Sequence, residues 1–150
     1  MEQEIDQRLH PFEQTLQRLE AITGVSRHIL AVLFAEVGWD LSPFPDAAPL
    51  ASWAGMCPSQ HESAGKQVRG RGRKGNKWLR AALVQAAHAT SRTLTYLGEQ
   101  YRRLKKRRGS KRAAIAVGHS ILVIYYHMMK SGECYQEKGI EYLKELDKQR

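Results

Sequence analysis

The amino-acid sequence predicts a mainly α-helical domain, and three observations lead to this prediction. Along several segments apolar residues recur every three or four positions, which is the spacing of one face of an α-helix. Glycine and proline residues separate those segments. The exception is the glycine-rich stretch before residue 76, where Val68 is the only strong strand former. That stretch is therefore predicted to form a basic Gly-rich loop or a small β-hairpin.

The first predicted helix covers residues 2–20 and carries an apolar seam. The seam consists of Ile5, Leu9, Phe12, Leu16 and Leu19. It can pack on the rest of the domain, or it can pair with another helix as in a coiled coil. Because a lone helix of this kind is marginally stable in water, one expectation is a homo-oligomer held together through this helix.

Residues 19–38 predict two helices joined by a turn at Gly24, with the second helix ending at Val37. This pattern is typical of a helix-hairpin-helix element, in which backbone N–H groups at a helix N-terminus hold a DNA phosphate. Under that interpretation Gly24 and Val25 contact nucleic acid. An ordinary αα-hairpin without a ligand accounts for the same residues, so both interpretations stay open.

The remaining elements follow from turn residues and helical spacing. Residues 39–50 are Pro-rich and predict a surface loop, which leads into a short helix at residues 48–54. After the basic stretch a helix begins with Asn76 as its N-cap. Its buried face is predicted to consist of Trp78, Leu79, Ala82, Leu83, Ala86 and Ala87. Three further helices are predicted at residues 95–107, 111–130 and 135–148.

Several classes of protein are excluded by the composition. No uninterrupted apolar run is long enough to cross a bilayer, and the charged N-terminus is not a signal peptide, so a cytoplasmic protein is expected. Cys57 and Cys134 are isolated, and the histidines and acids match no metal-ligand pattern, so no metal site and no disulfide framework is predicted. Gln60 and Gln67 stand where an ATP-binding P-loop needs Gly and Ser or Thr, which argues against ATP binding.

Positive charge is concentrated in the middle of the chain. Between Ser63 and Gly132 there are 17 Lys or Arg residues and one acid, whereas the rest of the chain has 7 basic and 14 acidic residues. Such segregation predicts a polyanionic partner, with nucleic acid as the first candidate. An anionic membrane surface is the second candidate, but the basic stretch lacks the Leu and Phe residues of an interfacial helix.

Two clusters carry most of this charge and are predicted to bind nucleic acid. The first basic cluster consists of Lys66, Arg69, Arg71, Arg73, Lys74, Lys77 and Arg80. The second basic cluster consists of Arg102, Arg103, Lys105, Lys106, Arg107, Arg108, Lys111 and Arg112. Glycines let backbone N–H groups approach phosphate oxygens, and arginine makes bidentate contacts. Neither basic cluster forms an obvious recognition helix with Asn or Gln beside Arg, so the contacts are expected mainly with the nucleic-acid backbone.

Ser63 lies three residues before the first basic cluster and raises the question of catalysis. A loop serine is commonly a turn residue. A nucleophilic serine needs positive charge around the phosphate under attack and a group that accepts its proton. Lys66 and Arg69 meet the first need. No proton acceptor is evident for the second, although His61 is a local candidate.

The motifs of the central stretch occur in a specific order. They are Gly55 and Pro58, then Ser63-Ala64-Gly65, then Lys74-Gly75-Asn76, and then Leu79-Arg80. Together with the later segment "GSKRAAIAVGHSILVIYY", this order resembles the C-terminal transposase domain of a bacterial insertion-sequence family, over residues 15–130. In that family the N-terminal half is a RuvC-like domain with a tetrad of acids, and the members are bridge-RNA-guided recombinases.

The resemblance implies a role for Ser63 and a set of partners. Ser63 aligns with the catalytic serine of the family, which attacks a DNA phosphodiester and forms a phosphoserine link without ATP. The implied partners are DNA, a guide RNA and, through the N-terminal helix, a second or longer transposase chain. The alternative is a non-catalytic helix-hairpin-helix module that binds nucleic acid.

The resemblance also implies a division of the chain. Residues 1–20 correspond to a remnant of a coiled-coil linker helix, 21–132 to the transposase domain and 133–150 to a helical tail. The acids of the RuvC-like half, with their divalent metal, have no counterpart in these 150 residues. The chain is therefore expected to hold no cofactor and to be inactive without that half.

Overall fold

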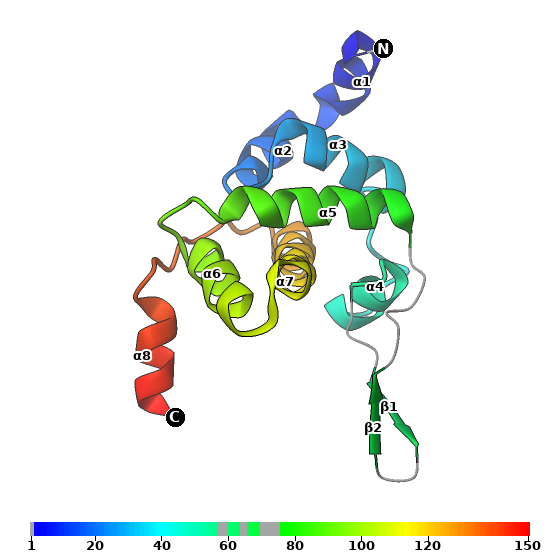
Figure 1. Cartoon of the computed structure of the whole chain (residues 1–150). Helices are drawn as coiled ribbons and strands as arrows, with labels where there is room; N and C mark the ends of the chain where they lie inside the picture. Colours follow the sequence, from blue (N-terminus) through cyan, green and yellow to red (C-terminus); the bar gives the residue numbers. More distant parts are fainter. Residues whose placement is uncertain (1, 57–59, 64–65, 70–75) are drawn as a thin grey trace.

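The computed structural model describes residues 2–56, 60–63, 66–69 and 76–150. These residues form a mainly helical fold, as the sequence predicts (Figure 1). The helices in chain order are α1 (Glu2–Leu9), the 3₁₀ helix η1 (His10–Phe12), α2 (Glu13–Glu20), α3 (Arg27–Glu36), α4 (Ala47–Trp53), α5 (Lys77–Thr90), α6 (Tyr96–Arg108), α7 (Ser110–Ser131) and α8 (Tyr142–Gln149). Two strands, β1 (Gln60–Ser63) and β2 (Lys66–Arg69), form an antiparallel pair, so the prediction of a small β-hairpin is confirmed.

The central element of the core is α7, which packs against α2, α4, α5 and α6. Its buried residues are Ala113, Ala114, Val117, Gly118, Ile121, Leu122, Tyr125, Tyr126 and Met128. The small residues let neighbouring elements come close. A Cβ atom on Gly118, for example, would lie 2.4 Å from Cε of Met56, which follows α4. Such close packing around α7 fixes the positions of α4 and α5, which flank the β-hairpin.

The predicted helix over residues 2–20 is interrupted at η1, so this prediction is only partly right. Pro11 lies in η1, and proline lacks the amide hydrogen that an α-helix needs while its ring clashes with the carbonyl four residues earlier. The apolar seam is divided as well. Leu16 and Leu19 are buried in the core, whereas Ile5 on α1 is 42% exposed. Figure 1 shows α1 pointing away from the helical body.

The turn between α2 and α3 packs directly on α5. Gly24 adopts a φ of +83°, and a Cβ atom there would lie 2.4 Å from the carbonyl oxygen of Ala86. The Val25 side chain is buried, and its amide donates to the carbonyl of Ile22 at 3.1 Å. The segment is therefore an αα-hairpin docked on α5, and phosphate contact by Gly24 and Val25 stays a prediction.

At the start of α5 the predicted N-cap is confirmed, but the predicted buried face is partly wrong. Asn76 is the N-cap, because its Oδ1 accepts hydrogen bonds from the amides of Trp78 and Leu79, both at 3.0 Å. The buried residues of α5 are Leu79, Ala82, Leu83, Ala86, Ala87 and Thr90. The prediction that Trp78 belongs to this face is wrong, since its side chain is 64% exposed. Position 78 is turned about 100° around the helix from Leu79, toward the side where Ala81 is also exposed.

The C-terminal helix begins at Tyr142, later than the predicted residue 135. The segment before it is held by Glu137, whose carboxylate accepts hydrogen bonds from four groups. The donors are the amide of Tyr96 at 2.6 Å, the amide of Gly139 at 2.9 Å, and the hydroxyls of Tyr135 at 3.0 Å and Thr23 at 3.2 Å. Residues 133–141 thus form a strap that links the start of α6 to the α2–α3 turn.

Replacing Glu137 by Gln is expected to lower the stability of the domain at neutral pH by about 1 kcal/mol. The reason is that the four hydrogen bonds then lose the negative charge of the carboxylate that accepts them. Burial alone would raise the pKa of Glu137, but the four hydrogen bonds outweigh it and lower the pKa below the ordinary 4.5. The contribution is therefore present above pH 4.5 and is lost as pH falls from 4.5 through the folded-state pKa.

Urea unfolding at a series of pH values measures this effect. The difference between the parent protein and E137Q should shrink as the pH is lowered below 4.5. E133Q removes another exposed carboxylate from the same strap and is the control, which should unfold like the parent. Equal stability of E137Q and the parent at neutral pH would contradict the role of Glu137.

None of the helices in the described part of the chain is both long and apolar enough to traverse a lipid bilayer. Cys134 is an exposed free thiol, while Cys57 lies outside the described residues.

Candidate nucleic-acid interface

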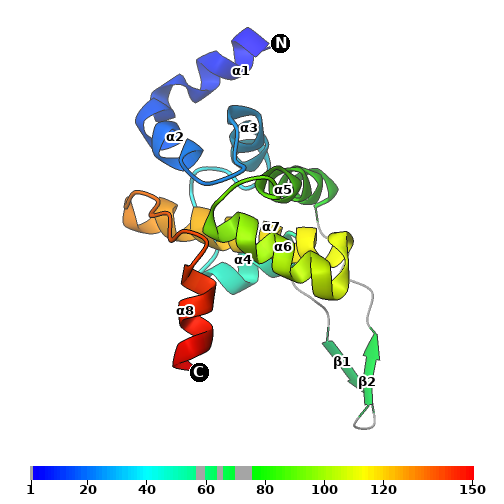
Figure 2. The ribbon, with the colours of Figure 1, turned by 60° about the vertical axis from the view of Figure 1, so that its left-hand side comes forward.

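Ser63 lies at one end of the two-stranded hairpin. Ser63 is the last residue of β1 and is paired with Lys66, the first residue of β2, while Gln60 is paired with Arg69 at the other end. The strand pair projects from the helical body on the side of α4 and the start of α5 (Figures 1 and 2). The register thus places the backbone of the candidate nucleophile opposite the backbone of the first basic residue. Arg71, Arg73 and Lys74 lie outside the described residues.

The first basic cluster continues onto the first turn of α5. Lys77 is exposed and Arg80 is half-buried. This turn contains no acidic residue, so the two cations add to the partial positive charge of the helix N-terminus. The turn is also anchored, because Asn76 Nδ2 donates a hydrogen bond of 2.5 Å to Oε2 of Glu36, the last residue of α3. The structure therefore holds a cationic helix end at the base of the hairpin.

Two members of the second basic cluster have partners within the protein. Arg102 donates to the carbonyls of Ser91 at 3.0 Å and Thr93 at 2.7 Å. Arg103 forms an ion pair with Asp147 of α8 at 2.9 Å, and this hydrogen bond is the main reason that its pKa is raised. Arg102 and Arg103 were predicted to contact nucleic acid. Because these contacts tie α6 to its neighbours, we do not include the two arginines in the proposed interface.

The other six residues of the second basic cluster surround the turn between α6 and α7. They are Lys105, Lys106, Arg107, Arg108, Lys111 and Arg112, and all of them are exposed. Gly109 forms this turn with a φ of +88°. Within the described ranges none of the six makes an ion pair. Six unpaired cations on one turn produce a local positive potential that attracts polyanions.

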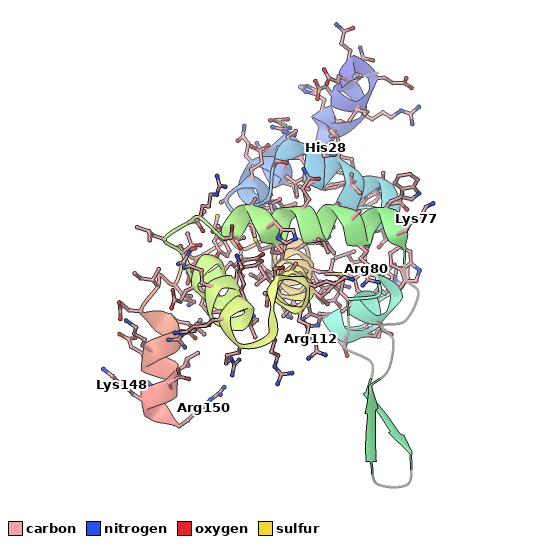
Figure 3. All side chains as sticks on the ribbon, in the orientation of Figure 1. His28, Lys77, Arg80, Arg112, Lys148 and Arg150 are labelled. Carbon is pink, nitrogen blue, oxygen red and sulfur yellow. The ribbon has the colours of Figure 1, made fainter. Side chains whose placement is uncertain are left out.

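The two cationic elements lie on the side of the molecule that bears the hairpin. Figure 3 shows Lys77 and Arg80 at the end of α5 that lies above α4 and the hairpin, and Arg112 at the lower face of the helical body. Lys148 of α8 and the C-terminal Arg150 lie at the left of the same view, whereas the hairpin lies at the right. In Figures 1 and 2 the turn between α6 and α7 and the hairpin both lie at the lower side of the helical body. The fold thus brings together cations that are about 30 positions apart in the sequence.

Residues that could hold a metal ion are not grouped in the described ranges. Those ranges contain no set of three or more His, Cys, Asp or Glu side chains arranged for a metal. The exposed cations described above suit contact with phosphate groups.

Comparison with known proteins shows the family. The model of the IS116/IS110/IS902 transposase family matches residues 16–102, a region that runs from α2 into α6 and includes the hairpin. The class of protein that this match defines is therefore a transposase. The chain belongs to the IS116/IS110/IS902 transposase family.

Individual relatives agree with the family match. The chain is 30% identical over 125 residues to the transposase for insertion sequence element IS1111A of Coxiella burnetii, with 80% of this chain and 34% of the relative covered. It is also 30% identical over 141 residues to the 43.6 kDa protein of insertion element IS110 of Streptomyces coelicolor, with 88% and 33% covered. The chain therefore spans about a third of the length of these relatives.

One feature of the interface was missed by sequence reasoning, namely the exposure of Trp78. The helical pattern placed this residue on the edge of an apolar face, and a large aromatic residue is usually assigned to the core. Lys77 comes directly before Trp78 and Arg80 two residues after it, and these nearby charges are the sequence signal that favours an exposed Trp78.

Proposed function

We propose that this chain is the part of an IS110-type transposase that binds DNA and supplies a serine nucleophile for transposition. The observation that carries the proposal is the position of Ser63, which is the last residue of β1 and is paired with Lys66. The hairpin lies on the same side as Lys77 and Arg80 of α5 and Arg112 of α7 (Figure 3). Membership of the transposase family supports DNA as the polyanion.

In the proposed step, Oγ of Ser63 forms a bond to the phosphorus of a DNA phosphodiester. The bond from phosphorus to one deoxyribose oxygen breaks, the serine hydroxyl gives up its proton to a base, and the released sugar oxygen takes up a proton. The new serine ester replaces the broken sugar ester, so the phosphate remains a diester and the later strand exchange consumes no ATP. Positive charge near the hairpin stabilises the charge that builds on the phosphate in the transition state.

The remainder of the reaction is assigned to other parts of the transposase. We propose that a RuvC-like half supplies the acidic residues and their divalent metal, that a guide RNA selects the target, and that the exposed end of the N-terminal seam at Ile5 pairs with another transposase chain. The second candidate function, a module that only binds nucleic acid, uses the same cations. A serine-linked protein–DNA adduct that survives denaturation separates the two functions, because a binding module forms none.

The cationic turn between α6 and α7 is expected to contact DNA phosphates. Replacing Lys111 and Arg112 by Gln should reduce the slope of log affinity against log salt by about 1.8, because each lost phosphate contact reduces this slope by about 0.9. Fluorescence anisotropy of labelled duplex DNA at a series of salt concentrations measures the slope.

A control removes one charge from α8, away from the hairpin. The K148Q variant loses a lysine of α8, and Figure 3 shows Lys148 on the side of the molecule away from the hairpin. Its salt slope should equal that of the parent protein. If K148Q lowers the slope as much per charge as the double variant does, the binding is not localised and the assigned interface is wrong.

A further inference from the structure

Trp78 is a large apolar side chain that lies in solvent at the cationic end of α5. Its side chain is 64% exposed, while the next residue, Leu79, is fully buried. The residues one and two turns further along the same side of the helix are Ala81 and Gln85, both exposed. Neither of them carries an aliphatic or aromatic group large enough to cover the indole. One side of α5 therefore presents an aromatic ring with only small or polar neighbours.

The charges around Trp78 select the kind of partner that the ring can bind. Nζ of Lys77 lies 5.0 Å from the centroid of the indole. Arg80 lies on the same turn, and this turn has no acidic residue. An apolar protein surface would have to desolvate these cations on binding, which is costly. A ligand that combines a flat aromatic group with negative charge satisfies both the indole and the cations.

The other exposed tryptophans lack this combination. Trp39 is 63% exposed, but its ring lies 6.0 Å from that of Phe12, and Asp40 follows it in the sequence. Trp53 is 43% exposed and its ring lies 6.0 Å from that of Phe44. Both indoles are therefore partly used in contacts with aromatic side chains of the protein. Among the tryptophans, only Trp78 has a lysine over its ring and a second cation, Arg80, on the same helical turn.

We propose that the indole of Trp78 stacks on an unpaired nucleobase while Lys77 and Arg80 bind the adjoining phosphates. In a duplex both faces of a base are covered by its neighbours, so an exposed ring can stack only on a base at an end, in a bulge or in a single strand. Stacking tolerates every base because each has an aromatic face. The inference rests on the proposed function, since it gives the cationic face an unpaired strand segment as its ligand.

Fluorescence of Trp78 tests the contact directly. The chain contains three tryptophans, so the W39F/W53F variant leaves Trp78 as the only indole. Titration with a single-stranded pyrimidine oligonucleotide should quench its emission, because a stacked base quenches indole. An oligonucleotide of the same length with abasic sugars should bind through its phosphates and leave the emission unchanged. DNA and RNA versions of the pyrimidine oligonucleotide show which strand the site prefers, and quenching by either supports stacking.

Affinity of the variants gives a second measurement. W78A should bind the pyrimidine oligonucleotide roughly 5- to 140-fold more weakly than the parent, which is the range for the loss of one stacked base. W78F should retain most of the affinity, and W39A, which removes an equally exposed indole, should retain all of it. None of the three changes should alter binding to the abasic oligonucleotide.

The results separate the inference from the function on which it rests. If anisotropy detects no binding of any oligonucleotide or duplex, the proposed nucleic-acid function itself fails. If the oligonucleotides bind but the emission of Trp78 does not change, and W78A binds as tightly as the parent, only the stacking role is overturned. Should W78A fail to fold, the quenching experiment still decides the question.

Discussion

Replacing Ser63 by alanine is expected to abolish the covalent protein–DNA adduct while DNA binding stays close to that of the parent. The reason is that the side-chain oxygen forms the bond to phosphorus, and no other group at this position can replace it. Loss of a nucleophile lowers the rate of such reactions by roughly 10³-fold or more, so the adduct should fall below detection. The measurement is a denaturing gel of the chain incubated with nicked DNA and with the RuvC-like half of a family transposase added in trans.

A second serine in cationic surroundings provides the matched control for this experiment. Ser110 is exposed at the first position of α7, between the basic residues of the turn that follows α6. S110A should therefore form the adduct at the parental level. Two results would count against Ser63 as the nucleophile: an adduct that persists in S63A, or an S63A variant that loses DNA binding rather than chemistry.

Replacing Gly24 by alanine is expected to produce the largest loss of stability, on the order of 2–5 kcal/mol. Two costs add at this position. The φ of +83° is strained for any residue with a Cβ atom, and that atom would lie 2.4 Å from the carbonyl oxygen of Ala86 and 2.8 Å from Cγ2 of Thr90. Because backbone cannot move aside as a flexible side chain can, the α2–α3 turn would have to lift from α5. Thermal and urea unfolding of G24A measure the loss.

A substitution at Gly38 measures the backbone cost alone, because Gly38 has nearly the same φ as Gly24 but no close contact. Its φ is +81°, and no described atom lies within 4 Å of a Cβ placed there. G38A should therefore lose only the backbone term, about 1–2 kcal/mol. If G24A is no less stable than G38A, the turn does not pack on α5 as tightly as described.

Much of the helical framework could be predicted from local patterns. Asn76 was recognised as an N-cap because the cap uses an interaction between a side chain and amides two or three residues later. The interruption near Pro11 is also a local effect, but the apolar seam continues across it and concealed the break. The late start of α8 was missed because Glu137 binds the amide of Tyr96, which is 41 residues away.

The candidate site was predictable only where its features depend on local sequence. Ser63, Lys77 and the basic turn after α6 stand out by residue type and charge alone. The roles of Arg102 and Arg103 were not predictable, because their partners include backbone carbonyls and a carboxylate on another helix. The exposure of Trp78 depends on which face of α5 docks on α7, and a step of one residue moves a side chain about 100° around the helix.

The sequence by itself determined that this protein is mainly helical, that its middle is strongly cationic and that it carries the residues of a transposase family. These properties depend on residue type and short-range spacing, which the chain carries in any conformation. Only the tertiary structure decided which cations are free and which are bound, that Trp78 faces solvent, and that the α6–α7 turn lies on the side of the hairpin. Those facts depend on contacts between residues far apart in the chain, because packing around α7 fixes how the helices are oriented.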